Sequence, residues 1–268
     1  MMKKRTLKTI LLWVAIIYVV ILIGIYSLQN YVIFQPKDLD KNHVYKFKNP
    51  FEEYFLKTTD NVELNVLLFK TEMTRKGLVL YFHGNAGNLS RWGKIHEDFV
   101  SRGYDIAILD FRGYGKSTGN PSEEPFYEDA KLFYDWALEK YPDDKFIIFG
   151  RSLGCAVASN LAMKVDIEKV ILETPFFNIS DAIRGHITRV LLPFDLRNDF
   201  PNNQHIQKIK EPIFIFAGTK DRVVLNSSTE KLKPFLKTND RYIVIEGKGH
   251  NDLNSSPKYN QELDLILK

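Results

Sequence analysis

The first pattern along the chain is a long run of apolar residues near its amino end. No charged residue occurs from Thr9 to Pro36, and the stretch from Ile10 to Leu28 (ILLWVAIIYVVILIGIYSL) is almost wholly apolar. At a rise of about 1.5 Å per residue, a helix of this length approaches the ~30 Å thickness of the hydrocarbon core of a bilayer. The pattern therefore predicts one transmembrane helix.

A cleaved signal peptide is the alternative interpretation of this run. Its apolar part is usually about 7–15 residues long and precedes a small-x-small cleavage site. The residues after Gly24 (IYSLQNYVIF) contain no such pair, which favours an uncleaved signal anchor. Basic residues precede the run (MMKKR) and none follows it until Lys37, so we expect a cytoplasmic amino end with the rest of the chain outside the cytoplasm. Residues 1–35 form this anchor and residues 36–268 a separate domain.

Beyond Pro36 the pattern changes to short apolar runs that alternate with amphipathic segments. A strand pair is predicted on either side of a turn at 59–61, from residues 53–57 and 62–70. Further strands are predicted at 77–82, 104–110, 145–150, 169–174, 212–218 and 241–246. Helices are predicted at 89–101, 122–141, 153–163, 227–236 and 257–267. This alternation indicates an α/β fold, with a mostly parallel central sheet and helices on both of its faces.

The charge of the chain is concentrated at its amino end. The formal net charge is +4. All of it comes from Lys3, Lys4, Arg5 and Lys8. Basic and acidic residues balance beyond Pro36, so the domain lacks the excess of basic residues typical of nucleic-acid binding, and we expect no nucleic-acid partner.

The single cysteine, Cys155, excludes an internal disulfide and is expected to pack as a small apolar residue.

The stretch FIIFGRSLGCA (146–156) raises the question of what Ser152 does. Serine is a favoured helix N-cap, and an apolar helix is predicted to follow it. A cap, however, does not explain the glycines two residues before and two residues after it, Gly150 and Gly154. A serine on a sharp turn from strand to helix needs small residues at both positions, because strand and helix pass close together. The pattern therefore predicts a nucleophile, provided that partners for it are found.

Polar residues follow four of the predicted strands. A glycine-rich turn begins at His83, Ser152 follows the strand 145–150, Asp221 follows the strand 212–218, and His250 follows the strand 241–246. The carboxyl ends of parallel strands meet at one edge of a sheet, where α/β proteins bind their ligands. We therefore expect a serine, an acid, a histidine and a glycine-rich turn to lie together.

Six motifs in this order resemble the α/β-hydrolase superfamily of serine hydrolases, over essentially all of residues 45–268. They are HGNAGN (83–88), DFRGYGKSTG (110–119), GRSLG (150–154), ETPF (173–176), GTKDRVV (218–224) and GKGHND (247–252). The match is to a lightly lidded, often membrane-anchored group that includes eukaryotic depalmitoylating hydrolases. The chain order Ser, Asp, His is also the order that this fold uses.

The resemblance implies an α/β-hydrolase catalytic domain with Ser152 as nucleophile. It implies His250 as general base and then acid, and Asp221 as the residue that orients the imidazole. The backbone N–H groups of Asn85 and Leu153 would form the oxyanion hole. The chemistry is consistent, because a serine hydroxyl becomes a good nucleophile only when a neighbouring base takes its proton.

Other titratable residues compete for these roles. Glu173 ends a predicted strand from which some α/β-hydrolases supply their acid, and it stays an alternative to Asp221. Asp252 is expected to be a local turn acid, and His83 to brace the oxyanion turn. The remaining histidines are scattered, so we expect neither a metal site nor a cofactor. A phosphate-loop interpretation of the GKS at 115–117 is excluded, because that motif requires glycine where this chain has Asp110.

The segment between the strands that end at Thr174 and begin at Pro212 is short for a lid. Within it, AIRGHITRVLLPF (182–194) predicts one amphipathic helix that covers either the acyl pocket or the core. An open site beside a bilayer suits esters or thioesters of lipid-like or small acyl groups, and the sequence leaves amides open. A peptidase or amidase of the same fold, and a non-catalytic membrane-tethered binding protein, are the alternatives. The oligomeric state is not determined by the sequence.

Overall fold

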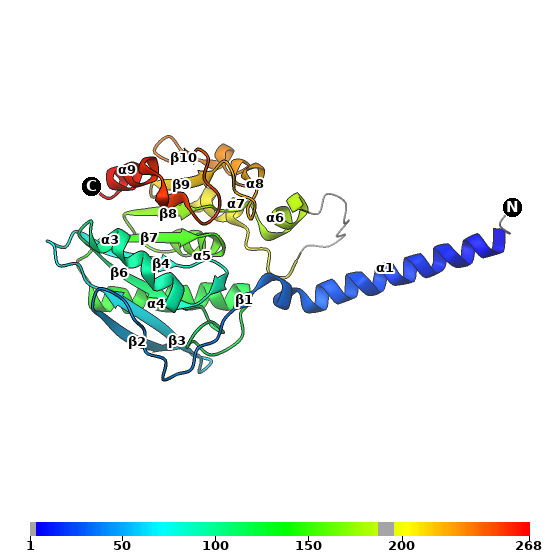
Figure 1. Cartoon of the computed structure of the whole chain (residues 1–268), viewed down its shortest axis with the longest axis horizontal. Coiled ribbons are helices and arrows are strands. Elements are labelled where there is room, and N and C mark those ends of the chain that lie inside the picture. Colours follow the sequence, from blue (N-terminus) through cyan, green and yellow to red (C-terminus); the bar gives the residue numbers. More distant parts are fainter. Residues whose placement is uncertain (1–3, 187–195) are drawn as a thin grey trace.

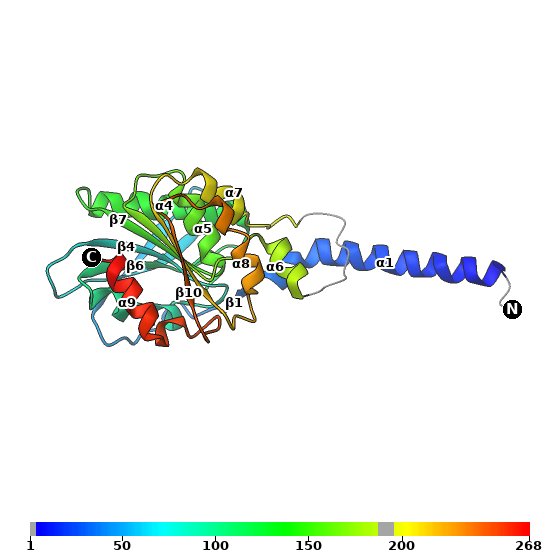
Figure 2. The same cartoon turned by 90° about the horizontal axis from the view of Figure 1, so that it is seen from above.

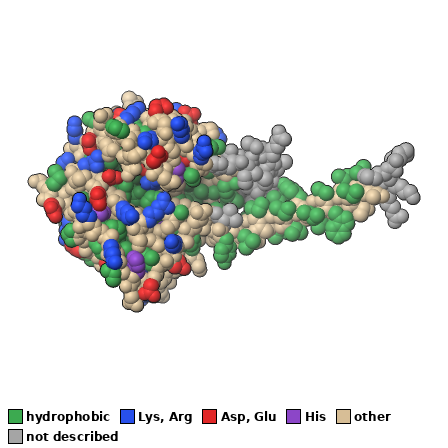
Figure 3. All heavy atoms as spheres, viewed as in Figure 1, with side chains coloured by type: hydrophobic (Ala, Val, Ile, Leu, Met, Phe, Trp, Pro, Cys, Tyr) green, Lys and Arg blue, Asp and Glu red, His purple; other side chains and the backbone are tan. Residues whose placement is uncertain are grey.

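The structure of the protein is a computed structural model that describes residues 4–186 and 196–268. Helix α1 (Lys4–Ile33) projects from the globular part as a long rod, with the amino end of the chain at its far tip (Figure 1). Apolar side chains cover the rod, whereas charged side chains are spread over the visible face of the globular part (Figure 3). By length and composition, residues Thr6–Tyr31 are suited to cross a membrane.

Within the described residues, eight strands form one sheet in the order β10-β9-β8-β7-β4-β6-β3-β2. The strands are β2 (Phe51–Lys57), β3 (Glu63–Phe69), β4 (Gly77–Phe82), β6 (Tyr104–Leu109), β7 (Phe146–Arg151), β8 (Lys169–Glu173), β9 (Ile213–Gly218) and β10 (Arg241–Ile245). Strand β3 is antiparallel to its neighbours β2 and β6, and the other neighbouring pairs are parallel. The predicted mostly parallel α/β sheet is confirmed.

Helices cover both faces of this sheet. The described helices after α1 are α2 (Leu89–Trp92), α3 (His96–Val100), α4 (Glu123–Lys140), α5 (Leu153–Ala162), α6 (Ile179–His186), α7 (Asn202–His205), α8 (Asn226–Glu230) and α9 (Pro257–Ile266), with 3₁₀ turns at Gly93–Ile95, Ile206–Lys208, Lys233–Phe235 and Leu253–Ser255. Helices α4 and α5 lie on one side of the sheet and α9 on the other (Figure 2). Each face has its own apolar core, because the near-continuous apolar strands are buried on both sides.

The predicted strands are found within about two residues of their expected ends, as is usual for boundaries. Two predicted helices are broken. The segment 89–101 divides at Gly93, where a side chain would collide with the ring of Phe47. The segment 227–236 ends its α-helix at Glu230 and continues as a 3₁₀ turn that contains Pro234.

The amphipathic helix predicted across 182–194 is described only in part. Helix α6 contains its beginning and contacts α8, and Ile179, Ala182 and Ile183 are half-buried against the core. Residues 187–195 lie outside the described part of the chain. The side chains of Ala182 and Ile183, at the start of the predicted helix, contact the core, and the alternative that the helix covers the acyl pocket stays a prediction.

A small second sheet, which the sequence pattern does not predict, joins the end of α1 to the domain. Strand β1 (Gln35–Pro36) pairs in parallel with β5 (Ala86–Gly87). Ile33 and Phe34 just before it are buried in the core. The boundary between residues 35 and 36 stays a prediction, but the core includes residues on its amino-terminal side.

A buried polar cluster joins α5 to α7. The imidazole of His205 contacts Ser159 Oγ through Nδ1 at 3.1 Å, and Asn160 Nδ2 donates to its Nε2 at 3.2 Å. Ser159 Oγ in turn donates to Asn202 Oδ1 at 2.9 Å. Burial, reinforced by repulsion from Lys164 and Lys208, lowers the pKa of His205 to about 4. The cluster thus holds a neutral imidazole.

This cluster predicts a loss of stability in acid. The folded-state pKa of His205 lies below its unfolded value of 6.5, so its contribution is complete above pH 6.5 and is lost as the pH falls towards 4. The loss should reach about 3 kcal/mol. Thermal melts of the full-length protein between pH 7 and pH 4 should show a smaller fall in Tm for His205→Gln than for the wild type. Equal falls would contradict a neutral buried His205.

Candidate active site

The register of the sheet brings the predicted strand ends to one edge. Arg151 at the end of β7 is paired with Glu173 at the end of β8, and Glu173 with Phe216 of β9. The end of β4 at Phe82 is level with Gly150. The loops that carry the predicted site residues therefore start side by side.

Ser152 lies between β7 and α5 in a strained backbone conformation. Its φ is 51° and its ψ is −115°, and its side chain makes no N-cap hydrogen bond to the helix. A helix N-cap is normally extended and accepts a bond from the first turn. A positive φ is costly for a residue with a Cβ, and such strain concentrates at functional sites. The geometry is therefore that of a nucleophile elbow rather than that of a cap.

The two glycines that flank Ser152 have no room for a side chain. A Cβ on Gly150 would lie 2.6 Å from the Cβ of Ala158 and 2.5 Å from the carbonyl oxygen of Gly154. A Cβ on Gly154 would collide with the carbonyl groups of Phe82 and His83. The expected close approach of strand and helix is confirmed.

The structure brings Asp221 and His250 together. His250 Nδ1 lies 2.7 Å from Asp221 Oδ2, so the Nδ1–H group donates to the carboxylate and Nε2 remains available as a base. The other carboxylate oxygen accepts bonds from the backbone N–H groups of Val223 and Val224, at 2.8 and 2.9 Å. One oxygen of Asp221 is thus held by the backbone, and the other contacts the imidazole of His250.

Arg151, which the sequence reasoning missed, connects the elbow to the histidine loop. Its Nη2 donates to the backbone carbonyl of His250 at 2.9 Å, and its Nε lies 3.2 Å from Glu173 Oε1. The other oxygen of Glu173 accepts from the hydroxyl of Tyr259 at 2.7 Å. The signal that could have indicated this role is a charged residue placed at the end of a buried strand, because a buried charge needs a partner.

Glu173 and Asp252 are the other acidic residues considered near His250, and both are engaged in other contacts. Glu173 is buried and its two oxygens are engaged by Arg151 and Tyr259. Burial, together with the negative charge of Glu173, raises the pKa of Tyr259 well above its ordinary value, so its hydroxyl stays a neutral donor. Asp252 accepts a bond from the N–H of Gly249 at 2.7 Å, as expected for a turn acid.

The predicted oxyanion donors lie on either side of the elbow. Leu153 is the first residue of α5, and Asn85 lies in the loop between β4 and β5. A Cβ on Gly84 would be only 3.6 Å from the Cβ of Ser152, so this loop passes directly beside the serine.

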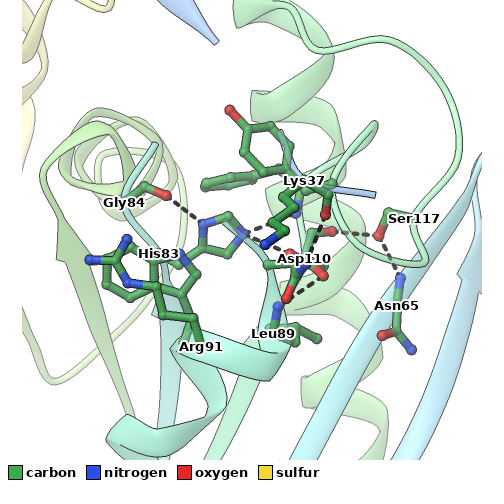
Figure 4. Close-up of polar contacts among 12 residues, drawn as sticks. Lys37, Asn65, His83, Gly84, Leu89, Arg91, Asp110 and Ser117 are labelled. Carbon is green, nitrogen blue, oxygen red and sulfur yellow. Dashed lines mark hydrogen bonds and ion pairs between the residues drawn. The ribbon is translucent and has the colours of Figure 1, made fainter. Parts of the chain in front are cut away.

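A buried pair holds this loop from behind (Figure 4). His83 Nδ1 donates to the carbonyl oxygen of Gly84 at 2.7 Å, and its Nε2 lies 3.0 Å from Asp110 Oδ1. Both side chains are fully buried, and burial raises the pKa of Asp110. The carbonyl of Gly84 and the N–H of Asn85 belong to one planar peptide unit. His83 therefore orients the peptide whose N–H group is the predicted oxyanion donor, which supports the expected bracing role.

Among the described residues, no metal site is found at this edge. No group of three or more His, Cys, Asp or Glu side chains in residues 4–186 and 196–268 is arranged to hold a metal ion. A cavity of about 760 Å³ lies between the end of α1 and the loop 113–121, and none of the predicted catalytic residues lines it.

Cys155 is buried and free, and burial raises the pKa of its thiol, so it is not a reactive thiolate.

Comparison with known proteins identifies the fold. Residues 77–186 match the profile of the alpha/beta hydrolase fold family. The chain is 31% identical to an uncharacterized protein of Mycobacterium tuberculosis, over 65% of this chain and 63% of that protein. It is also 31% identical to the lysophosphatidylserine lipase ABHD12 of Gallus gallus, over 71% of this chain and 57% of that protein. The chain thus spans about three fifths of the length of these two relatives.

Solved structures agree with this assignment. The Pyrococcus furiosus esterase Pf2001 superposes with a TM-score of 0.69, at 18% identity, over 88% of this chain and 96% of the esterase. Est1E of Butyrivibrio proteoclasticus, in its ferulic acid complex, superposes with a TM-score of 0.65, at 18% identity, over 80% of this chain and 98% of Est1E. The predicted α/β-hydrolase fold is confirmed.

Proposed function

We propose that this protein, a hydrolase of the α/β-hydrolase fold, is a membrane-anchored serine hydrolase that cleaves carboxylic esters or thioesters. The reaction proceeds through an acyl-enzyme on Ser152. The observation that carries the proposal is the backbone of Ser152, which is held at a φ of 51° without capping its helix. The hydrogen bond between Asp221 and His250 supports it independently.

In the first step, Ser152 Oγ attacks the acyl carbon of the substrate and its proton passes to His250 Nε2. The bond between the acyl carbon and the leaving oxygen or sulfur then breaks, and Nε2 returns the proton to the leaving group. Asp221 stabilises the transient imidazolium through its bond to Nδ1. Negative charge on the acyl oxygen is stabilised by the N–H groups of Asn85 and Leu153, with the amino end of α5 adding its dipole.

In the second step, water replaces the leaving group. Nε2 takes one proton from the water as its oxygen attacks the acyl carbon, and the bond to Ser152 Oγ breaks as that oxygen regains the proton. A free acid leaves and the serine is restored. Every proton is returned, so the cycle needs no cofactor, and no metal is assigned a role.

The substrate class follows from the relatives and from the anchor. The relatives include a lysophosphatidylserine lipase, and the fold neighbours include esterases, which supports an acyl ester, in particular a lipid-like one. A thioester substrate, as in depalmitoylation, uses the same chemistry. The amidase alternative needs a protonated amine as leaving group, and His250 could supply that proton as well. No specific observation favours the non-catalytic alternative.

The catalytic role of Ser152 predicts a large loss of activity on its removal. In the full-length protein in detergent, Ser152→Ala should lower the hydrolysis of a short p-nitrophenyl ester by a factor on the order of 10⁴ or more. It should also abolish labelling by a fluorophosphonate probe. Ser256→Ala is the matched control, because Ser256 lies outside the site at the start of α9 and makes no side-chain cap bond. Unchanged turnover by Ser152→Ala would overturn the proposal.

The choice of acid predicts different effects for two amide substitutions. Asp221→Asn should lower kcat by a factor on the order of 10⁴, because the amide favours the wrong histidine tautomer. Glu173→Gln should retain most of kcat but lower the free energy of unfolding by about 3 kcal/mol, since it weakens a buried pair with Arg151. Ester kinetics and thermal melts of both variants test this. A far lower kcat for Glu173→Gln than for Asp221→Asn would show that Glu173 is the acid.

The apolar run within α1 and the basic residues before that run predict an uncleaved anchor with the catalytic domain outside the cytoplasm. Protease added to spheroplasts, or to intact cells without an outer membrane, should digest the domain. Carbonate and high salt should not extract the protein, because the hydrophobic effect holds a spanning helix. A protected domain would reverse the orientation, and a soluble domain that begins near Asn30 would indicate a cleaved signal peptide.

A further inference from the structure

We propose that the exit segment of α1, residues 33–36, is a positioning element of the oxyanion hole. The inference rests on the proposed role of the Asn85 N–H group as an oxyanion donor. In this proposal, the exit segment holds the side chain of Asn85 and thereby fixes the direction of its backbone N–H.

The side chain of Asn85 makes three hydrogen bonds, and two of them are to the exit segment. Its Nδ2 donates to the carbonyl oxygen of Ile33. Its Oδ1 accepts from the backbone N–H of Gln35 at 3.3 Å and from the hydroxyl of Tyr114 at 2.8 Å. The side-chain oxygen accepts from two donors and the amide nitrogen donates to a fixed acceptor. The amide group of Asn85 therefore has a single orientation.

The same segment also holds the residues that follow Asn85. Gln35 pairs with Ala86 and Pro36 with Gly87 in the small parallel sheet. One residue further along, Asn88 Nδ2 donates to the carbonyl of Lys37 at 2.8 Å. The exit segment and the next residue, Lys37, therefore run beside residues 85–88 of the loop.

The exit segment is itself fixed to the domain rather than being a loose tether. The ring of Phe34 is 3% exposed and lies between Phe126 and Phe200, with ring centroids 5.4 and 6.0 Å away. Just before it, Asn30 Oδ1 accepts from Asn198 Nδ2 at 2.7 Å. The exit segment is therefore fixed relative to the domain and can hold the side chain of Asn85 in place.

Two anchors thus define the peptide unit that carries the proposed donor. His83 holds its carbonyl end, at Gly84, and the exit segment holds the side chain at its N–H end. Oxyanion donors act only when they are directed at the position of the developing charge. Loss of the second anchor should leave substrate binding intact and reduce the stabilisation of the transition state, which lowers kcat at unchanged KM.

The backbone of Gln35 permits a test of this contact, because its side chain is exposed and can be replaced. Gln35→Pro removes the N–H that binds Asn85 and is compatible with the extended backbone of β1, whereas Gln35→Ala keeps that N–H. In the full-length protein, we expect Gln35→Pro and Asn85→Ala each to lower kcat for a p-nitrophenyl ester about 10-fold at unchanged KM. Gln35→Ala should stay within about twofold of the wild type.

The double variant and a second control exclude a merely structural effect. Gln35→Pro and Asn85→Ala disrupt a shared contact, so their combined loss in kcat should be smaller than the product of the single losses. Gln29→Ala removes a bond from α1 to the N–H of Arg197, 2.7 Å long and away from the loop, and should leave kcat unchanged. Thermal melts of all variants should show that kcat does not follow Tm.

Full kcat in Gln35→Pro, a multiplicative loss in the double variant, or a loss that appears in KM would overturn the inference. Failure of the proposed function gives a different result. In that case the wild type itself shows no turnover that depends on Ser152 and no fluorophosphonate labelling, and the inference falls with it.

Discussion

The close approach of α5 to the ends of β7 and β4 is the constraint on which the candidate site depends. Only glycine fits at positions 150 and 154, because a side chain there would meet the backbone of the elbow or the carbonyl groups of Phe82 and His83. This contact forces Ser152 into its positive φ. It also brings the start of the oxyanion loop against the elbow, so one packing contact aligns the serine with a proposed oxyanion donor.

Buried polar contacts then hold the loops that surround this elbow. Arg151 donates to the backbone carbonyl of His250 and lies against the carboxylate of Glu173. His83, paired with Asp110, donates to the carbonyl of the peptide between Gly84 and Asn85. Charged groups are costly to bury without partners, so loss of one partner from these buried contacts should destabilise the loops. The arrangement is consistent with a site that is largely preorganised before substrate binds, which is how electrostatic catalysis gains its effect.

Most of the fold could be predicted from the sequence because its signals are local. Local sequence patterns predicted the strands, the long helix α1 and the sharp turn at Ser152. Tertiary packing did not change any of these conformations. The broken helix at Gly93 shows where this fails, because the ring of Phe47, distant in sequence, occupies the space beside Gly93. The break before Pro234 has a local cause, since proline cannot continue an α-helix. The pairing of β1 with β5 was equally invisible, since two-residue strands have no periodicity to detect.

The sequence by itself determined the α/β class, the order of the strands along the chain and the candidates Ser152, Asp221 and His250, because residue type and chain order carry that information. Only the tertiary structure decided that Asp221 is bonded to His250 while Glu173 is engaged by Arg151 and Tyr259. It alone decided that Asn85 is held by the end of α1. The physical reason is that a side chain's role depends on the partners it finds across the fold, and those contacts join residues far apart in the sequence.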